Sequence, residues 1–136
     1  SVHSKNLLLD SIDQILANKK LIQQDESKAT FCGLIKKEMG RINWNEDTPE
    51  LISRKLRAFD PWPGIYSYDI NGKRISFFEI EISRVQTREG VIQRDFSIGC
   101  RGGSVKLKII KPEGKNIMSG EEFLRGRPHL VNTSLS

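Results

Sequence analysis

Basic side chains are the residues of this sequence whose types and spacing point most directly to chemistry. Arg54, Lys55 and Arg57 crowd one predicted helix, and Lys106 and Lys108 alternate with apolar residues in a predicted strand. Residues two apart on a strand share a face, so we expect both lysines to point away from the apolar side. Such cations can bind the phosphates of a polyanion, although periodicity alone favours a merely solvated basic face.

Groups for acid–base, nucleophilic or metal chemistry are sparse. The sequence contains no G-x-S-x-G, HExxH or P-loop motif. Glu79 and Glu81 could form a carboxylate pair, but we expect them on the solvated face of an antiparallel strand. Cys32 and Cys100 lack the spacing of a zinc site and are expected to be buried free thiols, and the two histidines have no suitable partner. We therefore predict no catalytic residue and no metal site in this chain.

The bulk composition indicates a folded, water-soluble domain with a basic surface. The 136 residues suffice for one ordinary domain, with 37% hydrophobic and 29% charged residues. No apolar run approaches the ~20 residues of a membrane span, and no secretory leader is evident. Lys and Arg outnumber Asp and Glu by 22 to 17, and the excess lies after residue 30. A polyanionic partner is therefore the favoured class.

Two helices are indicated before the β-rich part of the chain. Leucine and isoleucine follow helical spacing within residues 4–18, and a polar linker follows at 19–28. This helix cannot bury its apolar stripe alone, so we interpret residues 1–28 as the remnant of a larger parent. The second helix is capped by Thr48, begins at Pro49 and must end before Pro61.

The period then changes from helical to alternating, which predicts a mainly β domain with some α structure at 29–136. Asn71-Gly72 separates two alternating runs and is a strong hairpin signal. Ser119 and Glu122 form an S-x-x-E capping box before a short helix, and the tail after Leu130 is expected to be loose. Strands are predicted at 65–68, 75–82, 90–93, 96–100 and 105–110, a number typical of a small antiparallel barrel.

Four segments resemble the methionyl-tRNA formyltransferase family in their order along the chain. RKLRAFDPWPG at 54–64 closely resembles the family's RKIRAFNPWPG, and KEMGRINW at 37–44 is similar to KEDGRIDW. QDESKAT at 24–30 resembles the linker sequence QDDSxAT, and GKNIMSGEEFLRG at 114–126 resembles GKKxMSxxEFLRG. The likeness spans about residues 7–127. Within the PWPG motif at 61–64, Trp62 is expected to be buried and to fill the space under the barrel.

The resemblance implies the fold and the role of the chain. The fold would be a small OB-like antiparallel β-barrel with an N-terminal helix and linker remnant and short flanking helices. Its role would be to bind initiator methionyl-tRNA for a cytoplasmic, monomeric parent that formylates this tRNA in translation initiation. The formyl donor, 10-formyltetrahydrofolate, and the catalytic residues would belong to the N-terminal domain in cis. No cofactor, DNA or membrane partner is expected for this chain.

The resemblance also carries the RNA-binding role to particular bases. Arg101-Gly102-Gly103 departs from the family's common Gly-Asp-Gly; a tight turn explains its glycines, and Arg101 favours a polyanion. Duplex RNA offers mainly phosphates and ribose hydroxyls, so scattered cations matter more than stacking aromatics, which are expected in apolar contexts. The predicted RNA-binding residues are Lys36, Lys37, Arg41, Arg54, Arg57, Lys73, Arg74, Arg101, Lys106 and Lys108.

Two alternatives stay open at the level of the sequence. Sugar-amine formyltransferases share a C-terminal barrel and a PWPG-like turn, and there the barrel helps to shape a nucleotide-sugar site. An unrelated OB-like adaptor is the third possibility. The spellings RAFDPWPG and MSGEEFLRG favour the tRNA enzymes.

Overall fold

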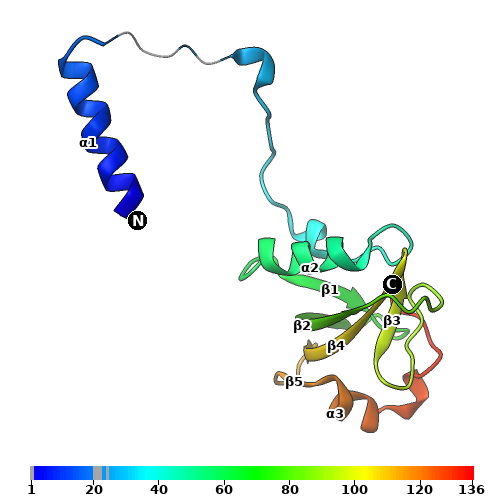
Figure 1. Cartoon of the computed structure of the whole chain (residues 1–136). Helices are drawn as coiled ribbons and strands as arrows, with labels where there is room; N and C mark the ends of the chain where they lie inside the picture. The colour runs from blue at the N-terminus through cyan, green and yellow to red at the C-terminus, as the bar shows by residue number, and fades with distance from the viewer. Residues whose placement is uncertain (1, 20–22, 24) are drawn as a thin grey trace. The chain divides into compact units, whose positions relative to one another are not determined.

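The computed structural model describes residues 2–19, 23 and 25–136, which form two compact units, Ser1–Gly33 and Leu34–Ser136 (Figure 1). In the first unit, α1 (Val2–Leu16) confirms the predicted helix and leaves its leucines and isoleucines exposed. The predicted linker lies partly outside the described residues, and η1 (Glu26–Lys28) occupies its end. The sequence placed the domain boundary after residue 28, and that boundary stays a prediction.

The second unit is built on an antiparallel sheet, as predicted. Its strands are β1 (Ile65–Tyr68), β2 (Arg74–Ser83), β3 (Ser97–Cys100), β4 (Gly103–Pro112) and β5 (Met118–Ser119). The order is β1-β2-β4-β3, and β5 pairs with β4. The hairpin between β1 and β2 turns at Asn71-Gly72, where Gly72 has a φ of +72° that favours glycine.

The sheet is open, which corrects the expectation of a barrel. β1 and β3 are the edge strands, and irregular segments cover their outer sides. Tyr68 of β1 exchanges two backbone hydrogen bonds with Ser136, and Ile92 forms a single bridge to Ile98 of β3. The strand predicted at 90–93 therefore consists of isolated bridges. These irregular segments provide hydrogen-bond partners for backbone N–H and C=O groups on the outer sides of β1 and β3. The two edge strands therefore do not pair with each other.

The tail after Leu130 is fixed in place, contrary to the sequence prediction. Leu135 is buried, and the backbone N–H of Leu135 donates to the carbonyl of Gly90 over 2.9 Å. Leu130 itself, at the end of η3 (Pro128–Leu130), is fully buried. The tail lacks a periodic pattern because it is held by scattered backbone hydrogen bonds rather than by a strand or helix.

Two compensating bulges interrupt the pairing of β2 with β4. Phe77 pairs with Ile110 and Glu79 with Ile109, so Phe78 is an extra residue on β2. The next pair, Ile80 with Leu107, makes Lys108 the extra residue on β4. The strict alternation predicted for β4 therefore ends at Lys108, and Phe78 is exposed beside a buried Phe77.

Helices pack at opposite ends of the sheet (Figure 1). α2 (Pro49–Ala58) begins at the predicted cap, where Thr48 Oγ1 accepts from the Leu51 N–H over 3.2 Å, and buries Ile52 against the sheet. α3 (Gly120–Arg125) has the predicted capping box of Ser119 and Glu122. Its Phe123 stacks on Phe96 with 5.5 Å between ring centroids, which joins this helix to the core.

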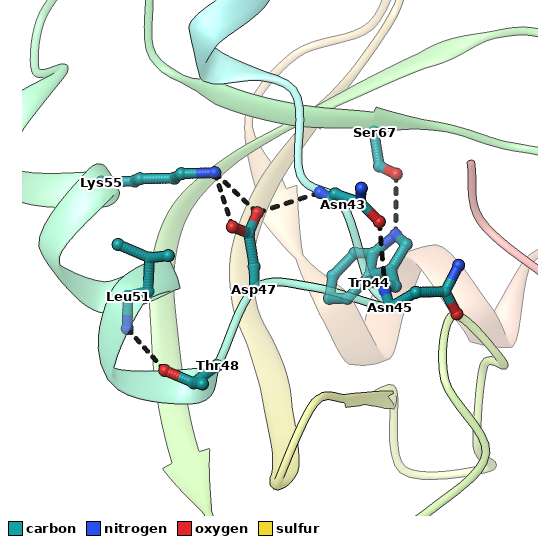
Figure 2. A network of polar contacts seen from close by, with 8 residues as sticks. All are labelled: Asn43, Trp44, Asn45, Asp47, Thr48, Leu51, Lys55 and Ser67. Carbon is teal, nitrogen blue, oxygen red and sulfur yellow. Dashed lines mark hydrogen bonds and ion pairs between the residues drawn. The ribbon is translucent and has the colours of Figure 1, made fainter.

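A polar network anchors the segment before α2 (Figure 2). The buried Asp47 carboxylate accepts from the Asn43 backbone N–H over 2.9 Å and from Lys55 Nζ over 2.6 Å. Next to it, the buried Trp44 donates through Nε1 to Ser67 Oγ over 2.9 Å. The network ties this segment to α2 and to β1, and thereby holds η2 (Lys37–Gly40) beside the sheet.

Candidate nucleic-acid interface

A basic hollow lies on the outer side of β1 and β2. We define it by its lining residues Lys37, Tyr68, Gly72, Arg74, Ser76, Phe78, Lys111, Pro112, Glu113 and Gly114. Strand register brings these groups together, because Arg74 pairs with Tyr68 on one side and Ser76 pairs with Lys111 on the other. Lys37 arrives from η2, whose backbone carbonyl at Lys37 accepts from the Tyr66 hydroxyl over 3.4 Å. The hollow thus gathers three cations and one carboxylate.

Two arginines flank a pair of tyrosine rings beside this hollow. The Arg74 guanidinium lies 3.9 Å from the Tyr66 ring centroid, and the Arg41 guanidinium lies 5.4 Å from that of Tyr68. The two tyrosine rings meet edge to face, with centroids 5.6 Å apart. Burial, and next the neighbouring Tyr68, raises the pKa of the Tyr66 phenol, so this hydroxyl stays a neutral donor. The order Arg74, Tyr66, Tyr68, Arg41 fixes two guanidinium groups on one surface.

Arg74 is held in place but keeps hydrogen-bonding capacity. Its Nη2 donates to the Pro63 carbonyl over 3.3 Å, and its backbone N–H donates to Glu113 Oε2 over 3.0 Å. The buried Nε has no hydrogen-bond partner among the described residues. Because Nε is buried, only the Nη groups of Arg74 could meet an anionic oxygen. A guanidinium fixed on an aromatic face is suited to such an oxygen, because little side-chain freedom is lost on binding.

An apolar hollow adjoins the basic one and shares Ser76 and Phe78 with it. We define it by Leu56, Arg57, Asp60, Pro61, Pro63, Gly64, Ser76, Phe77 and Phe78. It lies where the end of α2 and the PWPG turn meet β2. One predicted cation, Arg57, is therefore beside the group formed by Lys37, Arg41 and Arg74.

Trp62 is 58% exposed, so the expectation that it is buried is wrong. The space below the PWPG turn is taken by η2, where Gly40 is so close that an added Cβ would overlap the Gly64 carbonyl. The buried tryptophan of this domain is Trp44 instead. Phe78 is 49% exposed at its bulge. Two large aromatic side chains thus face solvent where the sequence indicated only apolar contexts.

Lys106 and Lys108 line a separate hollow with Glu79 and Glu121. Lys106 Nζ lies 3.8 Å from Glu121 Oε1. Lys108 Nζ lies 3.6 Å from Glu81 Oε2. Neighbouring carboxylates therefore offset part of the charge of both lysines.

The remaining predicted bases are exposed at scattered places. Arg54 lies on the solvent side of α2, where its Nε donates to the Glu50 carbonyl over 3.4 Å. Lys36 precedes η2, Lys73 lies in the turn between β1 and β2, and Arg101 lies in the turn between β3 and β4. The structure thus places Lys37, Arg41, Arg57 and Arg74 along one surface. Lys36 and Lys73 adjoin Lys37 and Arg74 in the sequence but line neither hollow, as is also true of Arg54, Arg101, Lys106 and Lys108.

Sequence reasoning did not include Lys111 among the site residues. Its signal is the strand register, because a pairing of β2 with β4 that places Lys111 opposite Ser76 brings it next to Arg74. That register could not be read from the hairpin signals, since β2 and β4 are not adjacent in sequence. Tyr68, whose ring underlies Arg41, was also missed, because its place depends on the bridge between Arg41 and Tyr66 of β1.

Other candidate groups match their sequence predictions in part. Cys100 is buried, and burial raises its pKa to about 11, whereas Cys32 is exposed, contrary to expectation. Glu79 and Glu81 are exposed on β2.

Within residues 2–19, 23 and 25–136, no three His, Cys, Asp or Glu side chains are grouped to hold a metal ion. None of the described helices has the length and apolarity to cross a membrane.

Comparison with known proteins gives a consistent match. Residues 34–128 match the family described as formyl transferase, C-terminal domain. The methionyl-tRNA formyltransferase of Dehalococcoides mccartyi is 32% identical over 95% of this chain and 43% of its own length. That of Rickettsia bellii is 35% identical over 92% of this chain and 43% of its own length. The chain thus spans less than half of these curated relatives. HypX from Aquifex aeolicus shares the fold, with a TM-score of 0.58, 20% identity, and coverage of 93% of this chain and 24% of HypX.

Proposed function

Because the chain belongs to the formyl transferase C-terminal domain family, we propose that it is the tRNA-binding domain of a methionyl-tRNA formyltransferase. In this proposal, the parent transfers a formyl group from 10-formyltetrahydrofolate to initiator methionyl-tRNA in the cytoplasm. A HypX structure that shares the fold is described in complex with tetrahydrofolic acid, in line with a folate donor in such enzymes. The catalytic groups would lie in the part of the relatives that this chain does not cover.

The observation that carries the tRNA-binding role is the ordered group of cations around the basic hollow. Lys37, Arg74 and Lys111 line it, and Arg41 lies over the Tyr68 ring at its edge. RNA phosphates attract such a group and release their counterions on binding, which supplies most of the affinity of a nonspecific contact. The net charge of +5 adds a long-range attraction of the same sign.

A salt titration of tRNA binding to the chain tests this function. If about four to six bases meet phosphates, log K should fall against log salt with a slope of roughly −3 to −5. Lys37→Ala and Lys111→Ala should each flatten the slope by nearly one unit. Lys5→Ala is the matched control, because Lys5 lies on α1 in the other compact unit.

Three results would contradict the proposal. The first is binding that does not depend on salt, and the second is an equal effect of the Lys5 variant. The third is displacement of tRNA by a nucleotide-sugar at concentrations too low to screen charge. That last result would favour the sugar-amine formyltransferase alternative, because a pyrophosphate would then occupy the basic hollow.

A further inference from the structure

We propose that the apolar hollow binds an unpaired base of a single-stranded RNA segment, which also meets the exposed Trp62. Phe78 lines this hollow, and so do Pro61 and Pro63, the two sequence neighbours of Trp62. The phosphates of the same segment then lie in the basic hollow. This inference rests on the proposed RNA-binding function and adds base stacking to a contact that scattered cations alone would make with a duplex.

The exposure of two aromatic rings is the first observation. Trp62 is 58% exposed and Phe78 is 49% exposed. The bulge at Phe78 turns this ring outward next to the buried Phe77. Large aromatic rings that face solvent on a folded domain mark binding surfaces, because they offer wide contact area with little loss of side-chain freedom.

The second observation is that the apolar and basic hollows are adjacent. Ser76 and Phe78 line both. A chain of nucleotides that places a base against Phe78 therefore has its backbone directed toward Arg74 and Lys111. This arrangement of aromatic rings beside a cationic groove is the one by which proteins bind single strands.

The two hollows differ in net charge as the base and the phosphate of a nucleotide do. Arg57 and Asp60 both line the apolar hollow, so their charges offset each other there. Lys37, Arg74 and Lys111 outnumber the single carboxylate of Glu113 in the basic hollow. The uncharged base fits the first and the phosphate fits the second. An apolar peptide would instead leave the cations of the basic hollow without a partner.

The test compares two RNA probes on the whole 136-residue chain. One is a single-stranded oligoadenylate of about ten nucleotides, within the usual site size for such surfaces. The other is a blunt RNA duplex with the same number of phosphates. Trp44 is buried and Trp62 is exposed, so quenching of tryptophan emission that disappears in Trp62→Phe reports stacking on Trp62.

Trp62→Ala and Phe78→Ala should each weaken binding of the single strand about tenfold, the usual effect of losing one stacking ring. Duplex binding should change less than about twofold, and the salt slope should stay the same because no phosphate contact is removed. If Phe78→Ala does not fold, Phe78→Leu replaces it in the binding assay, because leucine keeps much of the apolar volume but has no aromatic ring. Val85→Ala is the control, since Val85 is 67% exposed and lines neither hollow.

Equal losses for single strand and duplex, or unchanged binding in all aromatic variants, would overturn the stacking proposal. If tRNA binding keeps its salt slope in those variants, the proposed function stands and only the stacking site fails. If the unmodified chain shows no salt-dependent binding of tRNA, the proposed function itself fails.

Discussion

The guanidinium of Arg74 is stacked on Tyr66, with 3.9 Å between its central carbon and the ring centroid. One strand register and one turn produce this geometry, because Arg74 opens β2 opposite Tyr68 and donates to the Pro63 carbonyl of the PWPG turn. The residue therefore connects the sheet, the turn and the basic hollow. Its charge and its planar shape have separate consequences for binding.

Arg74→Ala and Arg74→Lys should separate these two contributions. Alanine removes the cation and should flatten the salt slope of tRNA binding by nearly one unit. Lysine keeps the charge but loses the planar stack on Tyr66 and the forked donors. We expect an unchanged slope and a weaker affinity at every salt concentration, measured by the same titration. An alanine variant with an unchanged slope would show that Arg74 does not meet a phosphate, and a lysine variant as flat as alanine would show that charge without the contact to Tyr66 is not enough.

The two tryptophans should differ in their contribution to stability. Trp44→Ala should lower the free energy of unfolding by about 3 to 5 kcal/mol, because it empties a buried site and leaves Ser67 without its donor. Trp62→Ala should cost less than about 1 kcal/mol, as for other exposed positions. Urea unfolding of both variants measures the difference.

A large loss of stability in Trp62→Ala would show that the PWPG turn buries this ring in solution. In that case the ring could not stack on a base. The Trp44 variant serves as the internal reference for a buried ring in the same domain.

Asp47 and Lys55 form the ionic centre of the network before α2. The Asp47 side chain is 6% exposed and that of Lys55 is 23% exposed, and Lys55 Nζ lies 2.6 Å from Asp47 Oδ2. Asp47→Ala should lower the free energy of unfolding by about 2 to 4 kcal/mol, because it leaves the Lys55 cation and the Asn43 N–H without their acceptor. Denaturant unfolding measures this cost.

The double variant Asp47→Ala with Lys55→Met is the control for this pair. Removing both charges leaves no unpaired cation, so the double variant should lose less stability than the sum of the single variants. Additive losses would mean that the two side chains are not coupled, and that Asp47 acts through Asn43 alone.

Local rules account for the parts of the fold that the sequence predicted. Thr48 with Pro49, the Ser119 capping box and the Asn71-Gly72 turn each depend on neighbouring residues, and all three are present. Trp62 was predicted wrongly because its burial depends on a distant contact, the approach of Gly40 to Gly64. The open sheet has the same kind of cause, since the tail at 132–136 covers an edge that no local pattern reveals.

The candidate surface likewise combines features set by neighbouring residues with features set by contacts between distant parts of the chain. A sequence pattern can identify Lys37 and Arg74 as candidate cations, the first of them in a family-like segment, but only the register shows that Lys111 joins them. It also cannot show that Phe78 is an extra residue at a bulge and therefore exposed. Which of the ten predicted bases lie together depends on the pairing of strands that are distant in sequence, so the sequence alone could not show it.

The ion pair of Lys108 with Glu81 leads to the last prediction, which concerns bases outside the basic hollow. Lys108 Nζ lies 3.6 Å from Glu81 Oε2, and the side chains are 40% and 65% exposed, so the pair itself adds little stability. If Lys108 also meets RNA, the carboxylate competes with a phosphate for this cation. Glu81→Gln should then raise tRNA affinity about twofold at low salt and steepen the salt slope by a fraction of a unit. The gain should vanish in the Lys108→Ala background, because the freed cation is no longer there. A gain of equal size with and without Lys108 would assign the effect to net charge alone and would remove Lys108 from the RNA-binding residues.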